Sequence, residues 1–180
     1  MSKYLELKVP LRLNTKWYDS LREALTGIKV DWKKSSYDFH ITIAFIENPA
    51  EDGVVIPVLD KHLSKWTAPK LTFNKIDAFE TIKYKDKVIH LTATEVPEEF
   101  LPNIDALRKD LSKAGCEGMV DFKLHVTLGT IRAGFPIGLP ALIKLIDKAQ
   151  INPFSLNLAA VEYKEYGGDC IKPYSLAKMR

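Results

Sequence analysis

The chain has 180 residues, 46% hydrophobic and 27% charged, which is the balance of an ordinary globular protein able to bury one sizeable core. Its net charge of +3 and pI near 8.7 are too mild for a dedicated nucleic-acid-binding domain, although they allow an anionic ligand. No apolar run approaches the ~18 residues that span a bilayer, and Glu6 interrupts the stretch where a signal peptide would be apolar. We therefore expect a cytoplasmic protein that does not contact a membrane.

Hydrophobic periodicity predicts strands and helices that alternate along the whole chain. In chain order we expect a strand at 4–13, a helix at 15–26, a loop at 31–38, a strand at 39–46, a helix at 54–66, strands at 70–80 and 88–94, a helix at 97–114, a strand at 124–131, a helix at 141–149, and a final hairpin of strands at 154–165 and 171–179. Pro10 predicts an edge position or a bulge in the first strand. Pro57 is expected in the first turn of its helix, where a proline is tolerated.

The order of these elements contains a duplication. The pattern of helix, strand, helix and hairpin occurs twice, in units of about 1–94 and 95–180, and both middle strands carry His-x-Thr. We therefore predict a single α+β domain over 1–180 with two pseudo-symmetric lobes. Each lobe is an antiparallel sheet with helices outside, and the two His-x-Thr strands face a central groove.

The two middle strands place a histidine and a threonine on one face. Residues i and i+2 of a strand project from the same side, so His40 lies beside Thr42 and His125 beside Thr127. Such strands facing one groove would surround an anion with two imidazoles and two hydroxyls. An imidazole has a pKa of ~6.5, so near pH 7 one ring can accept a proton while the other donates one.

A third triplet, His90-x-Thr92, falls in the hairpin of the first unit and outside the equivalent positions. For His90 a structural role is favoured over a contact with ligand along the groove wall. His62, the fourth histidine, has helical spacing with apolar neighbours and is expected on a helix face.

The paired motifs resemble those of the two-histidine (2H) phosphoesterase superfamily, which includes the bacterial 2′-5′ RNA ligase-like proteins, regarded as RNA cyclic phosphodiesterases. Segment 40–45 (HITIAF) is similar to the first family motif with its trailing phenylalanine, and segment 125–129 (HVTLG) is similar to the second. Several bacterial members place an arginine three residues after the second threonine. This chain has Thr130 there, and Arg132 lies two residues further on.

The resemblance implies a hydrolase that opens 2′,3′-cyclic phosphates or cleaves 2′-5′-linked RNA and nucleotides, with 2′-5′ ligation as the reverse reaction. One of His40 and His125 would deprotonate the nucleophile and the other would protonate the leaving oxygen, while Thr42 and Thr127 bind the non-bridging oxygens. The residues do not say which histidine is the base. No metal-ligand cluster and no phosphate-binding glycine loop is present in the sequence, so we expect neither metal nor cofactor.

Weaker candidates for substrate binding lie near predicted strand ends. They are Arg132, His90 and Tyr174, with Trp32 as a second aromatic and the lysines Lys33, Lys34, Lys85, Lys87 and Lys123. The expected partner is an RNA end or a small nucleotide, bound by a monomer. The alternatives are a phosphodiesterase for cyclic dinucleotides, a module that binds nucleotides or RNA ends without turnover, and a duplicated domain whose histidines are purely structural.

Overall fold

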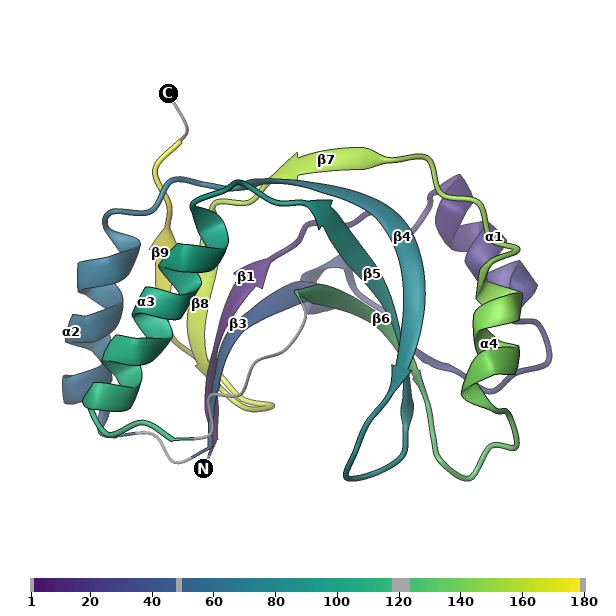
Figure 1. The fold of residues 1–180 in the computed structure, drawn as a ribbon, viewed down its shortest axis with the longest axis horizontal. Helices are drawn as coiled ribbons and strands as arrows, with labels where there is room; N and C mark the ends of the chain where they lie inside the picture. Colours follow the sequence, from purple (N-terminus) through teal and green to yellow (C-terminus); the bar gives the residue numbers. More distant parts are fainter. Residues whose placement is uncertain (1, 48–49, 118–123, 179–180) are drawn as a thin grey trace.

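A computed structural model describes residues 2–47, 50–117 and 124–178. In this part of the chain, nine strands form one antiparallel sheet that curves into an arch, with four α-helices on its outer, convex side (Figure 1). The strands are β1 (Lys3–Lys8), β2 (Asp31–Trp32), β3 (His40–Ile46), β4 (Lys70–Glu80), β5 (Lys87–Glu95), β6 (His125–Ile131), β7 (Phe154–Asn157), β8 (Ala160–Glu165) and β9 (Cys170–Ser175). The α-helices are α1 (Lys16–Ala24), α2 (Asp52–Leu63), α3 (Phe100–Lys113) and α4 (Leu139–Ile146), and a short 3₁₀ helix spans Ser36–Asp38.

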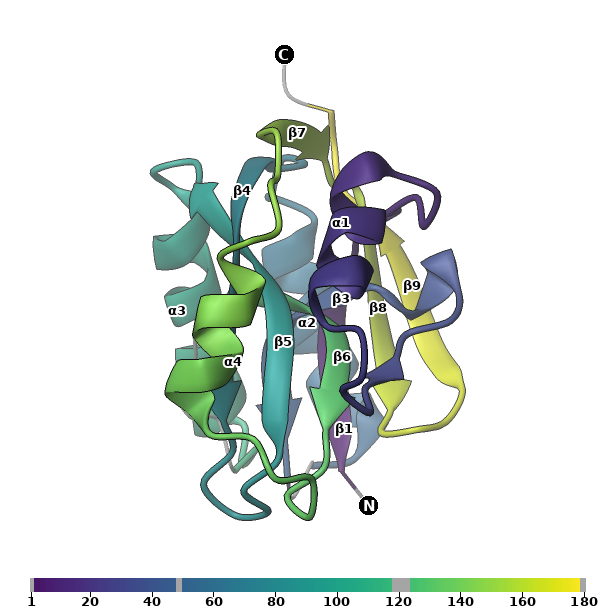
Figure 2. The same cartoon turned by 90° about the vertical axis from the view of Figure 1, so that its right-hand side faces the viewer.

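The sheet consists of two halves that meet between β3 and β6. Its order is β7-β4-β5-β6-β3-β1-β8-β9, and β2 also pairs with β6. Helices α2 and α3 cover the half that contains β1, β3, β8 and β9, while α1 and α4 cover the half that contains β4 to β7 (Figures 1 and 2). This arrangement confirms the predicted α+β class with antiparallel strands and helices outside.

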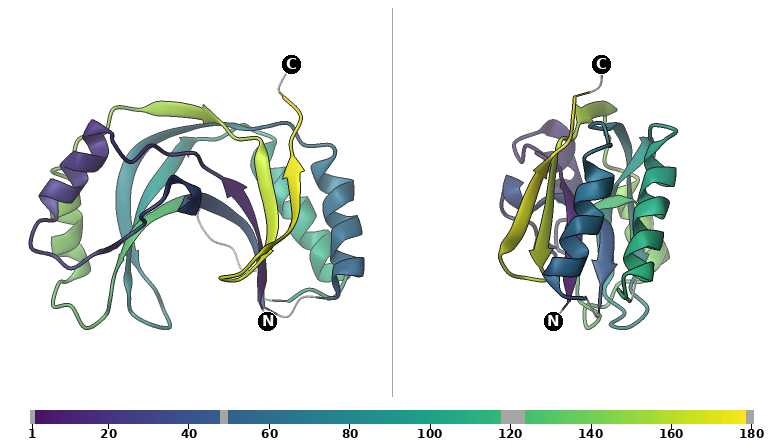
Figure 3. Two further views of the ribbon diagram at one scale, coloured as in Figure 1. Left: turned by 180° about the vertical axis from the view of Figure 1, so that it is seen from behind. Right: turned by 90° about the vertical axis from the view of Figure 1, so that its left-hand side faces the viewer.

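Each half of the sheet contains strands from both of the duplicated sequence units. The first unit places β3 and α2 in one half and its hairpin β4–β5 in the other, and the second unit does the reverse with β6, α4 and the hairpin β8–β9. Seen from behind, the two hairpins stand on opposite sides of the arch (Figure 3). The sequence units and the halves of the sheet are therefore different divisions of the chain.

Strands β3 and β6 have the same pattern of burial, which reflects their apolar alternation. In both, residues two, four, five and seven are buried and residues one, three and six are half-exposed. Each strand has two consecutive buried residues, Ile43-Ala44 in β3 and Leu128-Gly129 in β6. At these residues the register shifts in the pairing of β3 with β1 and of β6 with β5. Each strand thus turns its sixth residue back to the concave side of the arch.

Four predicted elements differ from the structure. The segment 31–38, expected as a loop, contains strand β2 and the 3₁₀ helix Ser36–Asp38. The first strand ends at Lys8, so Pro10 lies outside it, at the centre of a turn in which the Leu11 N–H donates to the Val9 carbonyl oxygen. Helix α2 begins at Asp52, earlier than expected, so Pro57 lies inside the helix rather than in its first turn. The expected strand 154–165 is two strands, because β7 pairs with β4 and β8 pairs with β1 on the opposite side of the arch.

None of the helices in the described part of the chain is both long and apolar enough to cross a bilayer.

Gly129 allows the chain of β2 to approach β6 closely. A Cβ atom at this position would come within 2.7 Å of Val30 Cγ1 and 3.0 Å of Trp32 Cε3. We therefore expect Gly129→Ala to lower the free energy of unfolding by about 1–3 kcal/mol through overpacking, measured by urea denaturation. Gly134→Ala is the matched control, because nothing lies within 4 Å of its Cβ. An equal loss in both variants would contradict the close approach.

Candidate active site

The two His-x-Thr motifs lie side by side on the concave face of the arch. Ile41 and Val126, both fully buried, form the pair through which β3 and β6 meet in antiparallel register. In that register His40 lies beside Thr127 and Thr42 lies beside His125, on the face opposite the buried pair. The structure therefore brings together the four residues that the sequence analysis assigned to chemistry.

The third triplet continues the same arrangement on β5. His90 pairs with Thr127, and Thr92 pairs with His125. The imidazole of His90 is buried, with a centroid 5.3 Å from that of His125, and its Nδ1 lies 3.2 Å from Thr92 Oγ1. His90 thus has both a structural bond to its neighbour and a place beside the candidate catalytic histidine.

His40 is held by two oxygens at the same ring nitrogen. Its Nδ1 lies 3.2 Å from the carbonyl oxygen of Asp38 and 3.2 Å from Glu6 Oε2 on β1. A carbonyl oxygen only accepts, so this bond requires the proton on Nδ1 and leaves the lone pair of the neutral ring on Nε2. Burial lowers the pKa of His40, and the nearby Glu6 and Asp38 offset that effect only in part.

Glu6 is the centre of a charge cluster on the concave side of β1. The side chain is 1% exposed, and its Oε1 lies 3.1 Å from Lys8 Nζ and 3.5 Å from Lys164 Nζ. Burial alone would raise the pKa of Glu6, but His40, Lys8 and Lys164 outweigh it and hold the pKa below its ordinary value. Among the described residues, Glu6 Oε2 accepts no hydrogen bond, although Nδ1 of His40 is 3.2 Å away.

His125 lies in a different environment. The ring of Phe79 on β4 packs edge-on at 5.2 Å between centroids, and His90 lies on the same side. These three rings, with Lys75, Asp77, Ala78 and Thr92, line a cavity of about 380 Å³. Burial would raise the pKa of Asp77, but a hydrogen bond from the Ala78 N–H and the nearby Lys75 hold it below its ordinary value. The cavity therefore combines an anionic carboxylate with aromatic walls.

Two of the weaker candidates lie away from these residues. Tyr174 donates a hydrogen bond of 2.8 Å to Asp60 on α2, so it contacts the helix on the convex side and not the groove. Arg132 follows the end of β6 and pairs with Asp31 at 3.1 Å and Asp86 at 3.2 Å. Its guanidinium is engaged there, so the structure gives no support for Arg132 in the place of the family arginine.

The predicted basic residues are divided between two regions. Lys33 and Lys34 line a separate cavity together with Trp32 and Arg132. Lys85 and Lys87 lie at the β4–β5 turn near Glu80, at 4.0 and 3.7 Å, respectively. Lys123 lies outside the described residues. His62 is on α2, as expected, where its Nε2 lies 2.6 Å from Asp110 of α3.

Sequence reasoning missed Glu6, Phe79 and Asp77 as parts of the site. For Glu6 a signal was available, because it is the polar residue between Leu5 and Leu7 in an alternating strand and therefore projects from the face opposite the core. Which face meets His40 depends on the pairing of β1 with β3, and nothing in the sequence states that pairing. Among the residues that the structure describes, no group of three or more His, Cys, Asp and Glu side chains could hold a metal ion.

Comparison with known proteins finds similarity in structure alone. No family model matches the chain, and no curated protein matches it either. Its structure is similar to TT0787 of Thermus thermophilus, with a TM-score of 0.65, 14% identity and 100% of both chains covered. E. coli LigT complexed with 3′-AMP has a TM-score of 0.62 at 14% identity over 98% of each chain, and Kluyveromyces marxianus Usb1 has 0.59 at 12% identity over 97% of this chain and 98% of its own. The chain therefore shares the fold of TT0787, LigT and Usb1, and this similarity in fold supports the resemblance inferred from its two His-x-Thr motifs.

Proposed function

We propose that this protein is a phosphodiesterase that opens 2′,3′-cyclic phosphates or cleaves 2′-5′-linked RNA and nucleotides by acid–base catalysis between His40 and His125. The observation that carries the proposal is the pairing of β3 with β6, which sets two imidazoles and two threonine hydroxyls around one place on the concave face. The similarity in fold to LigT complexed with 3′-AMP supports a nucleotide as the substrate.

In this mechanism His40 is the general base. Its lowered pKa keeps the ring neutral near pH 7, and the hydrogen bond from Nδ1 to the Asp38 carbonyl leaves Nε2 to take a proton from water or from a ribose hydroxyl. Protonation at Nε2 creates an imidazolium, and the ionised Glu6 carboxylate, 3.2 Å from Nδ1, stabilises that charge. Glu6 is therefore a positioning residue that acts through His40.

His125 is the general acid and protonates the leaving oxygen. It lies on the opposite strand from His40, so the two proton transfers occur on different sides of the bound phosphate. Thr42 and Thr127 donate hydrogen bonds to the non-bridging oxygens, where the negative charge of the transition state is held. The cavity beside His125, with Phe79, Asp77 and His90, accommodates the ribose or base on the leaving side.

The test of the function is a panel of 2′,3′-cyclic, 2′-5′-linked, 3′-5′-linked and cyclic dinucleotide substrates, incubated in EDTA with the products identified by mass. We expect turnover of the first two classes in EDTA, because no step of the mechanism uses a metal. Tight binding without any product would indicate a binding module, and turnover of the cyclic dinucleotide alone would indicate the alternative enzyme.

We expect His40→Ala and His125→Ala each to lower kcat by about 10²–10⁴-fold, the usual worth of one acid or base. Both side chains are half-exposed on the concave face, so the fold should persist by circular dichroism. His62→Ala is the control: this histidine bonds Asp110 between two helices and should affect stability but not turnover. Full activity in both site variants would contradict the assignment of His40 and His125 as the catalytic base and acid.

We expect Glu6→Gln to lower the pKa of His40 further, because it removes the negative charge that favours the imidazolium. If His40 is the base, it must be neutral, so the acidic limb of the kcat/KM profile should move to lower pH. NMR titration of the imidazole measures the same shift without substrate. The control is Glu162→Gln, which changes the same charge on β8 opposite Glu6. Movement of the basic limb instead would make His40 the acid.

A further inference from the structure

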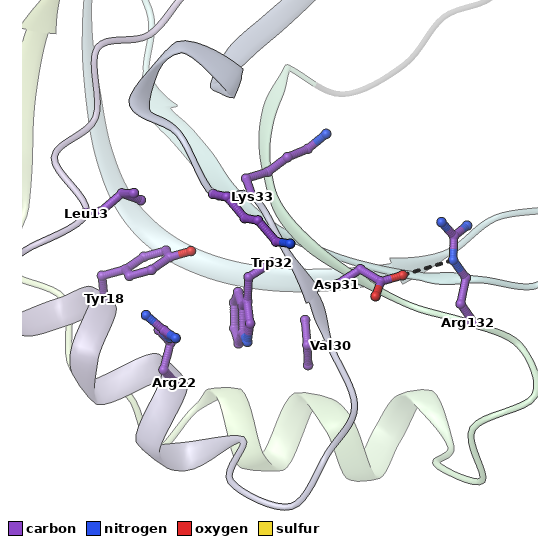
Figure 4. A pocket seen from close by; sticks show the side chains of 9 residues that line it. Leu13, Tyr18, Arg22, Val30, Asp31, Trp32, Lys33 and Arg132 are labelled. Carbon is purple, nitrogen blue, oxygen red and sulfur yellow. Dashed lines mark hydrogen bonds and ion pairs between the residues drawn. The ribbon is translucent and has the colours of Figure 1, made fainter. Parts of the chain in front are cut away.

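A second cavity, of about 700 Å³, lies at the outer edge of β2, where the loop after β1 and helix α1 face that strand. We call it the Trp32 pocket; it is lined by Leu13, Tyr18, Arg22, Val30, Asp31, Trp32, Lys33, Lys34 and Arg132 (Figure 4). Two aromatic rings, Tyr18 and Trp32, meet edge to face at 5.8 Å between centroids. The Trp32 ring is half-buried, so part of its surface faces the cavity.

The pocket carries excess positive charge. Its one carboxylate, Asp31, is already paired with Arg132 at 3.1 Å. Within the described ranges of the chain, Arg22, Lys33 and Lys34 form no ion pair with a carboxylate, and the Arg22 guanidinium lies 5.9 Å from the centre of the Tyr18 ring. Three uncompensated cations around an indole are a combination suited to a phosphate and an attached base.

A buried polar atom in the pocket also lacks a partner. Tyr18 is 2% exposed, and its hydroxyl has no hydrogen bond to any described residue. Figure 4 shows this hydroxyl directed from α1 toward β2. Burial raises the pKa of the phenol, so it keeps its proton and remains a donor. A buried donor without an acceptor costs free energy, which a ligand oxygen would recover.

The pocket lies on the convex, helix-covered side of the sheet, because Tyr18 and Arg22 of α1 line it, whereas the candidate active site is on the concave side. Trp32 pairs with Gly129, two residues beyond Thr127 and roughly 7 Å further along the strand. Lys33 and Trp32 extend to opposite sides of β2 (Figure 4), and the charge of Lys33 helps to lower the pKa of His40. A strand bound at the His40 side would pass Lys33 and the edge of β2 to reach the Trp32 pocket.

We propose that the Trp32 pocket is a subsite for an RNA strand, which holds a neighbouring nucleotide with its base on Trp32 and its phosphate between Arg22 and Lys34. This inference rests on the proposed function and extends it, because it makes the preferred substrate an RNA end rather than a free mononucleotide. The site then has two parts, one for the reacting phosphate and one for the strand that carries it.

The experiment compares a trinucleotide ending in a 2′,3′-cyclic phosphate with the mononucleotide 2′,3′-cyclic phosphate, both in EDTA. We expect Trp32→Ala to raise KM about tenfold for the trinucleotide, the order of one stacked base, and to leave KM for the mononucleotide unchanged. Arg22→Gln and Lys34→Gln should raise the same KM and lower its dependence on salt. Lys109→Gln on α3, which removes an exposed charge from the other half of the arch, is the matched control.

Trp32 packs against Gly129, so Trp32→Ala could fail to fold. Trp32→Phe is the second variant, because it keeps an aromatic ring at this position. It should retain most of the trinucleotide affinity. Equal KM values in all variants, or a wild type that binds adenosine monophosphate as tightly as the trinucleotide, would overturn the subsite while leaving the proposed function intact. If the wild type turns over neither substrate, the proposed function fails, and fluorescence-anisotropy titration of a labelled trinucleotide against the same variants still decides the subsite.

Discussion

The candidate site depends on the contact between Ile41 and Val126. Among the described residues it is the one registered pair between β3 and β6, and both side chains are fully buried. Because strands alternate, burying these two residues forces His40 and Thr127 to one side of the pair and Thr42 and His125 to the other, all on the concave face. A shift of one residue in either strand would send its histidine into the core beneath the helices. The hydrophobic core thus fixes the register of the catalytic groups.

Beyond this pair the pseudo-symmetry ends, because His40 and His125 have different neighbours. That difference in surroundings suits acid–base chemistry. On one side β1 brings a buried carboxylate, Glu6, to His40. At the equivalent place on the other side, β5 brings the imidazole of His90 to His125, and β4 adds the ring of Phe79. Two identical histidines in identical surroundings would titrate together. In the proposed mechanism, these different neighbours would let one copy of the duplicated motif accept a proton and the other donate one.

Much of this architecture could be predicted from the sequence, for identifiable reasons. The apolar alternation of 40–46 and 125–131 indicated the strands and their faces. The repetition of elements did not indicate the halves of the sheet, because each half takes strands from both sequence units. Strand pairing was less accessible: the division of 154–165 between β4 and β1 depends on contacts far away in the chain. The contact between Glu6 and His40 and the assembly of the Trp32 pocket could not be predicted for the same reason, since both depend on which strands lie together. Local periodicity indicates which face of a strand is buried, and only the fold shows which side chains from other strands contact that face.

The position of β1 in the middle of one half has a consequence for biosynthesis. It lies between β3 and β8, so one of its edges has no partner until β8 has been made. The cation Lys164, which compensates Glu6 at 3.5 Å, belongs to that last hairpin. A nascent chain can therefore form the β1–β3 pair early, yet the other edge of β1 is open to aggregation or to chaperones until β8 has been made. The hairpin β8–β9 is the element that closes this edge of β1.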